Sequence, residues 1–175
     1  MLEEAVAKIR GGGSREKEQE GLPIDDAWSP EINLNVPVLI PESFVPDIDL
    51  RLELYRKLSR IRNSVEMEVF SEELTDRFGK LPLEVIMLIN IMKIKNKCFE
   101  AGIIKLDGGP RGATIKFFND RFNNPKGLLD YIHMKKEFVK VKNDQLTIKQ
   151  NWKSIKSRIT GAYAIVSDLA QSAKM

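Results

Sequence analysis

The pair Gly79-Lys80, within residues 72–85 (EELTDRFGKLPLEV), is the first place where the sequence suggests chemistry. A glycine followed by a lysine can belong to a P-loop, which holds nucleotide phosphates with its backbone N–H groups. That loop also needs a glycine five positions earlier and a serine or threonine after the lysine. Leu74 and Leu81 occupy those two positions here. We therefore interpret Gly79 as the end of a helix, where glycine accepts a left-handed backbone.

A second glycine-rich stretch, DGGPRG at 107–112, follows a short apolar run. Anion binding at such a loop requires the N-terminus of a helix directly after it. The next residues, Ala113–Phe118, instead continue as an apolar and β-branched run. The pattern therefore predicts a hairpin turn between two strands.

Histidine and cysteine, the side chains most used in metal sites and nucleophilic catalysis, occur once each, as His133 and Cys98. A metal site needs several such ligands at set spacing, and a nucleophile needs a base beside it. His133 adjoins apolar positions of a helix expected over 125–136, which favours a half-buried structural role. Cys98 adjoins Phe99 on another expected helix, which favours packing. We expect no catalytic residue, no metal site and no cofactor in this chain.

The single cysteine also excludes an internal disulfide, so a reducing cytoplasm is the simplest location. The first residues, MLEEAVAKIR, lack the basic region and apolar core of a secretory signal. The most apolar run, 81–94, contains Glu84, Asn90 and Lys93 and is too short and too polar to span a bilayer. These observations predict a cytoplasmic protein without membrane contact.

Basic side chains cluster in the last third of the chain, although the net charge of +3 is too small to indicate a nucleic-acid partner by itself. The cluster consists of Lys135, Lys136, Lys140, Lys142, Lys149, Lys153, Lys156 and Arg158. Two acids, Glu137 and Asp144, lie among them. The candidate contacts to nucleic-acid phosphates are Lys140, Lys142, Lys153 and Lys156. A lysine-rich surface that meets only water is the competing interpretation.

A second charged surface is expected on a helix from Asn63 or Ser64 to Phe78. At 100° per residue, one side gathers the apolar residues Met67, Phe70, Leu74 and Phe78. Another side gathers Glu66, Val69, Glu73 and Asp76. Because arginine pairs with carboxylates through two parallel hydrogen bonds, this patch predicts a site for an arginine-bearing partner. An acidic helix face that meets only water is the alternative.

The elements that position these residues follow from periodicity and turn signals. The first half predicts an amphipathic helix over 1–10, a charged linker over 11–30, a strand over 32–40, a helix from Asp47 or Asp49 to about Arg62, the helix ending at Phe78, and a third from Pro82 to Gly102. The second half predicts hairpins over 103–118 and 138–149, a short helix from 125 and a last helix from about 151. The fold class is therefore α+β, with helices packed on a small antiparallel sheet made of two hairpins and an N-terminal strand.

Three motifs in the first half of the chain resemble the C-terminal domain of bacterial transcription-repair coupling factors. They are PESFVPD at 41–47, RLELYRKL at 51–58 and ELTDRFGKLP at 73–82. The resemblance covers about residues 31–175 and implies a C-terminal regulatory domain there. It also implies that residues 1–10 end the preceding translocase domain and that 11–30 link the two.

Members of that family are ATP-dependent DNA translocases that displace RNA polymerase stalled at DNA damage and recruit nucleotide-excision repair. The resemblance implies that ATP, Mg²⁺, RNA polymerase and DNA are bound by other domains, so this fragment is not expected to be an enzyme. It also implies that this domain docks on the factor's own N-terminal repair-recruiting module. Docking there masks the binding site of the excision-repair damage-sensing ATPase and restrains translocation.

The resemblance assigns the docking role to particular residues of this sequence. Glu73 and Asp76, the acids of the ELTDRFG motif, look like the carboxylates that face the N-terminal module. Thr75 departs from the family pattern, in which an apolar residue is common. Because Thr75 lies at the margin of the core face, the docking expectation is unaffected. A DNA-binding module formed by 135–158 is the alternative function.

Overall fold

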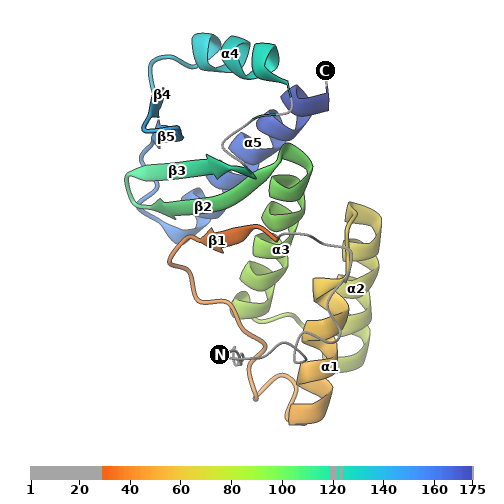
Figure 1. Ribbon diagram of the computed structural model, residues 1–175. Helices are drawn as coiled ribbons and strands as arrows, with labels where there is room; N and C mark the ends of the chain where they lie inside the picture. The colour runs from red at the N-terminus through yellow and green to blue at the C-terminus, as the bar shows by residue number, and fades with distance from the viewer. Residues whose placement is uncertain (1–28, 119–121, 123, 175) are drawn as a thin grey trace, which may run out of the picture.

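The computed structural model describes residues 29–118, 122 and 124–174 (Figure 1). The predicted helix over 1–10 and most of the predicted linker therefore lie outside the described residues. The elements in chain order are β1 (Glu31–Asn33), α1 (Ile48–Ser59), α2 (Ser64–Phe78), α3 (Leu83–Ala101), β2 (Ile103–Gly109), β3 (Gly112–Phe117), α4 (Pro125–Met134), β4 (Val139–Lys142), β5 (Gln145–Lys149) and α5 (Ile155–Lys174). The α+β class predicted from the sequence is confirmed.

Within residues 29–118 and 124–174, the sheet has five strands in the order β1-β2-β3-β5-β4. The two predicted hairpins, β2–β3 and β4–β5, are both present and antiparallel. The β4–β5 turn has the expected chemistry, since Asn143 and Asp144 both have the positive φ that a tight hairpin turn requires. β1 pairs with β2 in the parallel direction, so the sheet is mixed rather than wholly antiparallel.

The first strand is shorter than the sequence suggests. A strand was expected over 32–40, but β1 ends at Asn33. Asn35 has a φ of 55°, which turns the backbone out of the extended conformation. Pro37 has no N–H to donate to a neighbouring strand. Beyond the strand, Leu34 and Ile40 are still buried, so the segment keeps its apolar contacts without a ladder of hydrogen bonds.

Arg158, expected on the basic surface, is instead buried and only 6% exposed. Its guanidinium donates hydrogen bonds to the carbonyl oxygens of Leu34 (3.1 Å) and Asn35 (3.2 Å), just after β1. It also donates to Trp152 and Lys153, just before α5. The side chain therefore ties the segment after the first strand to the start of the last helix.

Helices α1 and α2 are capped at their N-termini as predicted. The Asp47 carboxylate accepts hydrogen bonds from the N–H groups of Asp49 and Leu50 at the start of α1. The Asn63 side chain accepts one from the N–H of Glu66 at the start of α2. Gly79 ends α2 with a φ of 97° and a ψ of −162°, which is a glycine conformation but not the left-handed helical one that was expected.

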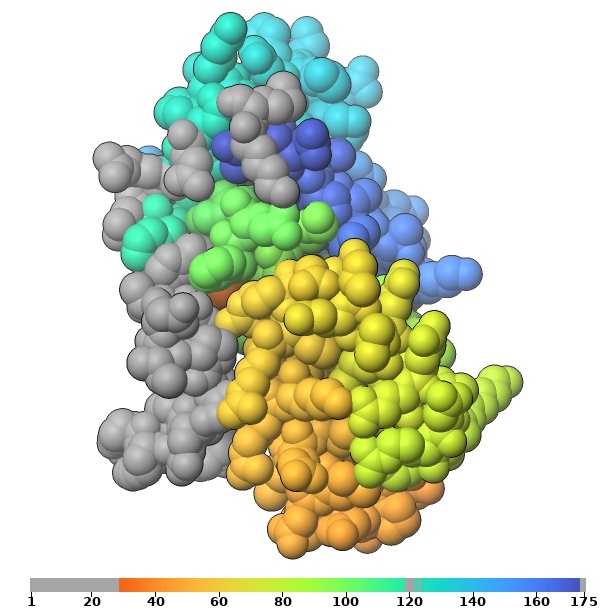
Figure 2. Space-filling model, turned by 90° about the vertical axis from the view of Figure 1, so that its right-hand side faces the viewer, coloured from red at the N-terminus to blue at the C-terminus, as the bar shows by residue number. Residues whose placement is uncertain are grey.

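The apolar residues form two clusters that share α3. One lies between the sheet, α3 and α5, and the other lies between α1, α2 and the first half of α3. Ile94 and Cys98 belong to the first cluster, whereas Val85 and Ile89 belong to the second. Figure 1 shows α3 running from the α1–α2 end of the molecule to the sheet. In Figure 2, α1 and α2 (orange and yellow) form one continuous surface, away from α4 at the opposite end.

Several side chains lie elsewhere than the periodicity suggested. His133, expected to be half-buried, is exposed on α4. Phe99, Tyr163 and Leu129, expected on apolar stripes, are at least one-third exposed because each helix buries a narrower arc than its apolar residues cover. Cys98 is buried, as predicted.

Candidate interdomain binding surface

A groove with a volume of about 680 Å³ runs between α1 and α2. Its apolar lining comes from Leu50, Leu54, Ile61, Val65, Val69 and Phe70. Its charged lining comes from Glu53, Arg56, Lys57, Arg60, Glu66, Glu73 and Arg77. Val65 and Val69 are 68% and 58% exposed, so the groove presents apolar side chains to solvent. The charged residues that line it come from both helices and the turn between them. We name this the α1–α2 groove.

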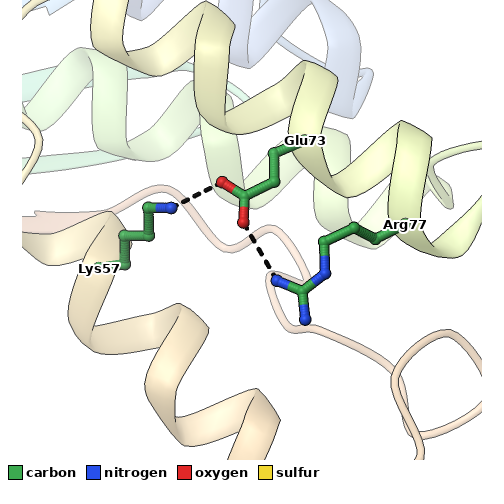
Figure 3. A network of polar contacts seen from close by, with 3 residues as sticks. All are labelled: Lys57, Glu73 and Arg77. Atoms are coloured by element: carbon green, nitrogen blue, oxygen red, sulfur yellow. Dashed lines mark hydrogen bonds and ion pairs between the residues drawn. The ribbon is translucent and has the colours of Figure 1, made fainter.

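Glu73 lies in the α1–α2 groove with both carboxylate oxygens engaged (Figure 3). Lys57 Nζ, from α1, lies 2.6 Å from Oε1, and Arg77 Nη1, one turn further along α2, lies 3.1 Å from Oε2. The Lys57 hydrogen bond is the main cause that lowers the pKa of the Glu73 carboxyl, with Arg77 adding to it and partial burial opposing it. Glu73 is therefore an ionised carboxylate held between two cations of its own chain.

Asp76 differs from Glu73 in its surroundings. It is exposed on α2, outside the α1–α2 groove, and makes no ion pair with the residues that the structure describes. Glu66 and Val69 do line the groove, together with Glu73. Glu66 also caps the turn before α2 by accepting a long hydrogen bond, 3.4 Å, from the N–H of Arg62. The structure thus brings three of the four predicted residues into one groove and places Asp76 beside it.

Sequence reasoning missed the two cations that bind Glu73. Arg77 follows Glu73 by four residues, a spacing that brings side chains together on a helix and could have indicated the pair. Lys57 lies 16 residues earlier, on a different helix. Its contact depends on how α1 packs against α2, for which the sequence gives no local signal.

The predicted basic contacts lie on two separate elements. Lys140 and Lys142 are exposed on β4, the edge strand of the sheet. Lys153 and Lys156 are exposed around the start of α5. Because Arg158 is buried, it does not belong to any basic surface.

The described residues include the single cysteine of the chain, Cys98, which is buried. They contain no group of three or more side chains suited to holding a metal ion. Burial raises the pKa of the Cys98 thiol far above its usual range, so the sulfur stays protonated and unreactive. None of the helices in the described part of the chain has the length and apolar character needed to cross a membrane.

The structure is that of a small α+β domain with an apolar groove bordered by charged side chains. Residues 34–128 match the model of the TRCF domain, so the chain belongs to that family. It is 36% identical to the transcription-repair-coupling factor of Rickettsia prowazekii over 155 residues, which are 89% of this chain and 12% of that protein. It is 29% identical to the Escherichia coli protein of the same name over 174 residues, which are 99% of this chain and 15% of that protein.

The fold is similar to a solved structure described as the crystal structure of the C-terminal domain of transcription-repair coupling factor. The TM-score is 0.71, the sequence identity is 20%, and the match covers 84% of this chain and 95% of that one. The chain spans about one eighth of the length of the first of these relatives.

Proposed function

We propose that this chain is the C-terminal regulatory domain of a cytoplasmic, bacterial transcription-repair coupling factor. In this proposal it binds the N-terminal repair-recruiting module of the same factor. Bound there, it masks the site for the excision-repair damage-sensing ATPase and restrains translocation along DNA. ATP hydrolysis and contact with RNA polymerase belong to other domains of the factor. Membership of the TRCF domain family supports the proposal.

The observation that carries the docking role is the exposed side of α2. Asp76 is a solvent-exposed carboxylate that makes no ion pair with the described residues, and Val69 nearby is 58% exposed. An apolar contact flanked by carboxylates suits a partner surface that carries arginines, because the guanidinium binds a carboxylate through two parallel hydrogen bonds. Asp76 can accept such a bond without breaking a contact in its own domain.

The strength of these contacts is consistent with a regulatory role. Exposed ion pairs typically contribute about 0.2–1 kcal/mol each, so a docked state held by a few of them can open. Opening requires a ligand with higher affinity for the open state than for the docked one. We assign this role of opening the docked state to RNA polymerase, which binds other domains of the factor.

The decisive experiment replaces Asp76 by alanine in the full-length factor. Asp76→Ala removes a docking carboxylate but leaves the Lys57–Glu73–Arg77 network intact. We expect tighter binding of the damage-sensing ATPase, measured by surface plasmon resonance, and a higher basal rate of ATP hydrolysis. Combining it with Glu73→Ala is expected to increase both effects.

The matched control is Asp130→Ala, which removes the same charge from an exposed position on α4. Figure 1 shows α4 at the opposite end of the molecule from α2. If the Asp76 variants bind the damage sensor and hydrolyse ATP as the wild-type factor and the control do, the docking role of α2 is wrong.

A further inference from the structure

One face of the sheet gathers lysines that are scattered along the sequence. Paired residues of neighbouring strands point to the same side of a sheet, and successive residues alternate between sides. The register places Lys105 opposite Lys116, Lys140 opposite Thr147, and Lys142 opposite Gln145. Thr147 is in turn opposite Thr114, and Lys149 is opposite Gly112. Lys105, Lys116, Lys140, Lys142 and Lys149 therefore share one face, which we name the outer sheet face.

The outer sheet face is open to solvent. The opposite side of β2, β3 and β5 carries the buried residues, among them Leu106, Ile115 and Ile148, which pack in the cluster with α3 and α5. Figure 1 shows α5 passing behind β2 and β3. On the outer side Lys116, Lys140, Lys142 and Lys149 are all exposed.

Charge on this face is unevenly distributed. At the β1–β2 side, Glu31 and Asp107 accompany Lys105, and the Lys105 amine lies 3.7 Å from the Asp107 carboxylate. The other three strands, β3, β5 and β4, contribute four lysines and no acid to the face. The positive field is therefore concentrated over β3, β5 and β4.

A shallow hollow of about 570 Å³ adjoins Lys149 at the end of β5. Its lining includes Thr114, Thr147, Lys149 and the turn residue Arg111, the backbone of Gly109 and Gly112, and one acid, Asp107. A Cβ at Gly109 would meet nothing within 4 Å, so the backbone there is open to a ligand. Lysine amines, threonine hydroxyls and exposed backbone are the groups that proteins use to contact phosphates.

We propose that the outer sheet face binds the phosphate backbone of duplex DNA. Among its paired residues there is no large apolar or aromatic side chain. An interface with an acidic protein would need such residues at its centre. A single-stranded nucleic acid would need aromatic rings on which bases stack. Phosphate contact without base stacking is what a lysine and threonine surface provides, and duplex DNA offers the densest array of phosphates.

This surface is independent of the proposed docking on the N-terminal module. It also differs from the linear basic segment 135–158, because Lys116 lies outside that segment. Lys153, Lys156 and Arg158 lie inside the segment but outside the face. The two basic surfaces therefore make different predictions for the same binding experiment.

The test measures fluorescence anisotropy of a labelled short duplex of arbitrary sequence with the 175-residue chain. The triple variant Lys116→Gln, Lys140→Gln and Lys149→Gln is expected to bind at least about tenfold more weakly at low salt, because three phosphate contacts are lost. The slope of log affinity against log salt, measured between about 50 and 200 mM, is expected to become shallower by about 3, one unit per lysine. All three side chains are exposed, so we expect an unchanged melting temperature.

The matched control is Lys80→Gln, Lys126→Gln and Lys136→Gln, which removes the same charge from exposed positions outside the sheet. It is expected to keep most of the affinity and the salt slope of the wild-type chain. The proposal would be overturned by no duplex binding at the lowest salt, by an equal loss in both triple variants, or by a larger loss in the double variant Lys153→Gln, Lys156→Gln. Competition by polyglutamate as effective as that by unlabelled duplex would also overturn it, since the partner would then be an acidic polypeptide.

Discussion

At the scale of single residues, Glu73 and Asp76 are unequal acids although they lie three positions apart on one helix. Lys57 and Arg77 occupy the two oxygens of Glu73, whereas Asp76 makes no ion pair with the described residues. An arginine from a partner would compete with Lys57 and Arg77 at Glu73, whereas no described residue competes with it at Asp76. We therefore infer that Asp76 makes the first contact and that Glu73 adds specificity once its own cations move.

The Lys57–Glu73–Arg77 network should also make the stability of the free domain depend on pH. The Glu73 pKa is lowered in the folded state, mainly by Lys57, so its contribution is present above the unfolded-state pKa and is lost as the pH falls through the folded one. We expect Glu73→Gln to lower the free energy of unfolding near neutral pH by roughly 0.2–1 kcal/mol per exposed pair. Urea unfolding at neutral and at acidic pH measures the difference.

The control for this pH effect is Glu68→Gln, another exposed acid of α2. Glu68 points away from the α1–α2 groove and should not give the same pH-dependent difference. A Glu73→Gln penalty that stays constant from neutral to strongly acidic pH would show that ionisation of Glu73 is not its source.

At the scale of elements, local signals predicted the helices of the first half well. The Asn63 cap and Gly79 gave the bounds of α2 correctly, because a side-chain acceptor and a positive-φ residue act within a few positions. Asp47 likewise marked the start of α1. The acidic motif could therefore be placed on a helix face from the sequence alone.

Features that depend on distant partners were not predictable in the same way. The parallel pairing of β1 with β2 joins residues about 70 positions apart, and no turn chemistry signals it. Arg158 looked like one more surface cation because basic residues surround it in the sequence. Its burial depends on the carbonyls of Leu34 and Asn35, which lie more than 120 positions earlier in the sequence.

The buried Arg158 gives a prediction about how the elements are joined. Arg158→Met keeps much of the side-chain volume but leaves the carbonyls of Leu34 and Asn35 without their donor. The bond to the Leu34 carbonyl is buried, and leaving a buried polar group unpaired costs about 1–3 kcal/mol, so we expect a clear fall in the melting temperature. Lys156→Met, an exposed neighbour, is the matched control and should leave the melting temperature nearly unchanged.

At the scale of the whole molecule, the two apolar clusters differ in size. Among the described residues, the cluster between the sheet, α3 and α5 contains 22 buried residues, whereas the one between α1, α2 and α3 contains 11. Since the hydrophobic contribution grows with the apolar area buried, the α1–α2 end is held less strongly. It is also the end that carries the α1–α2 groove.

Native-state hydrogen exchange should reveal this difference. Amides within α1 and α2 are expected to exchange through an opening of lower free energy than amides of β3 and α5. The measurement is exchange at increasing sub-denaturing concentrations of urea, followed by mass spectrometry. A single opening free energy shared by α2, β3 and α5 would mean that the domain unfolds as one unit and that α3 does not separate two parts.

The continuous helix α3 has a further consequence for how the domain works within a larger assembly. Its 19 residues span about 28 Å and join the α1–α2 end to the sheet. A rigid spacer of this length holds two binding surfaces at a fixed separation, so that the first contact raises the effective concentration of the second. If the module bound at one end and the DNA bound at the other are held in the same assembly, each weak contact strengthens the other. Loss of one contact would then weaken the second.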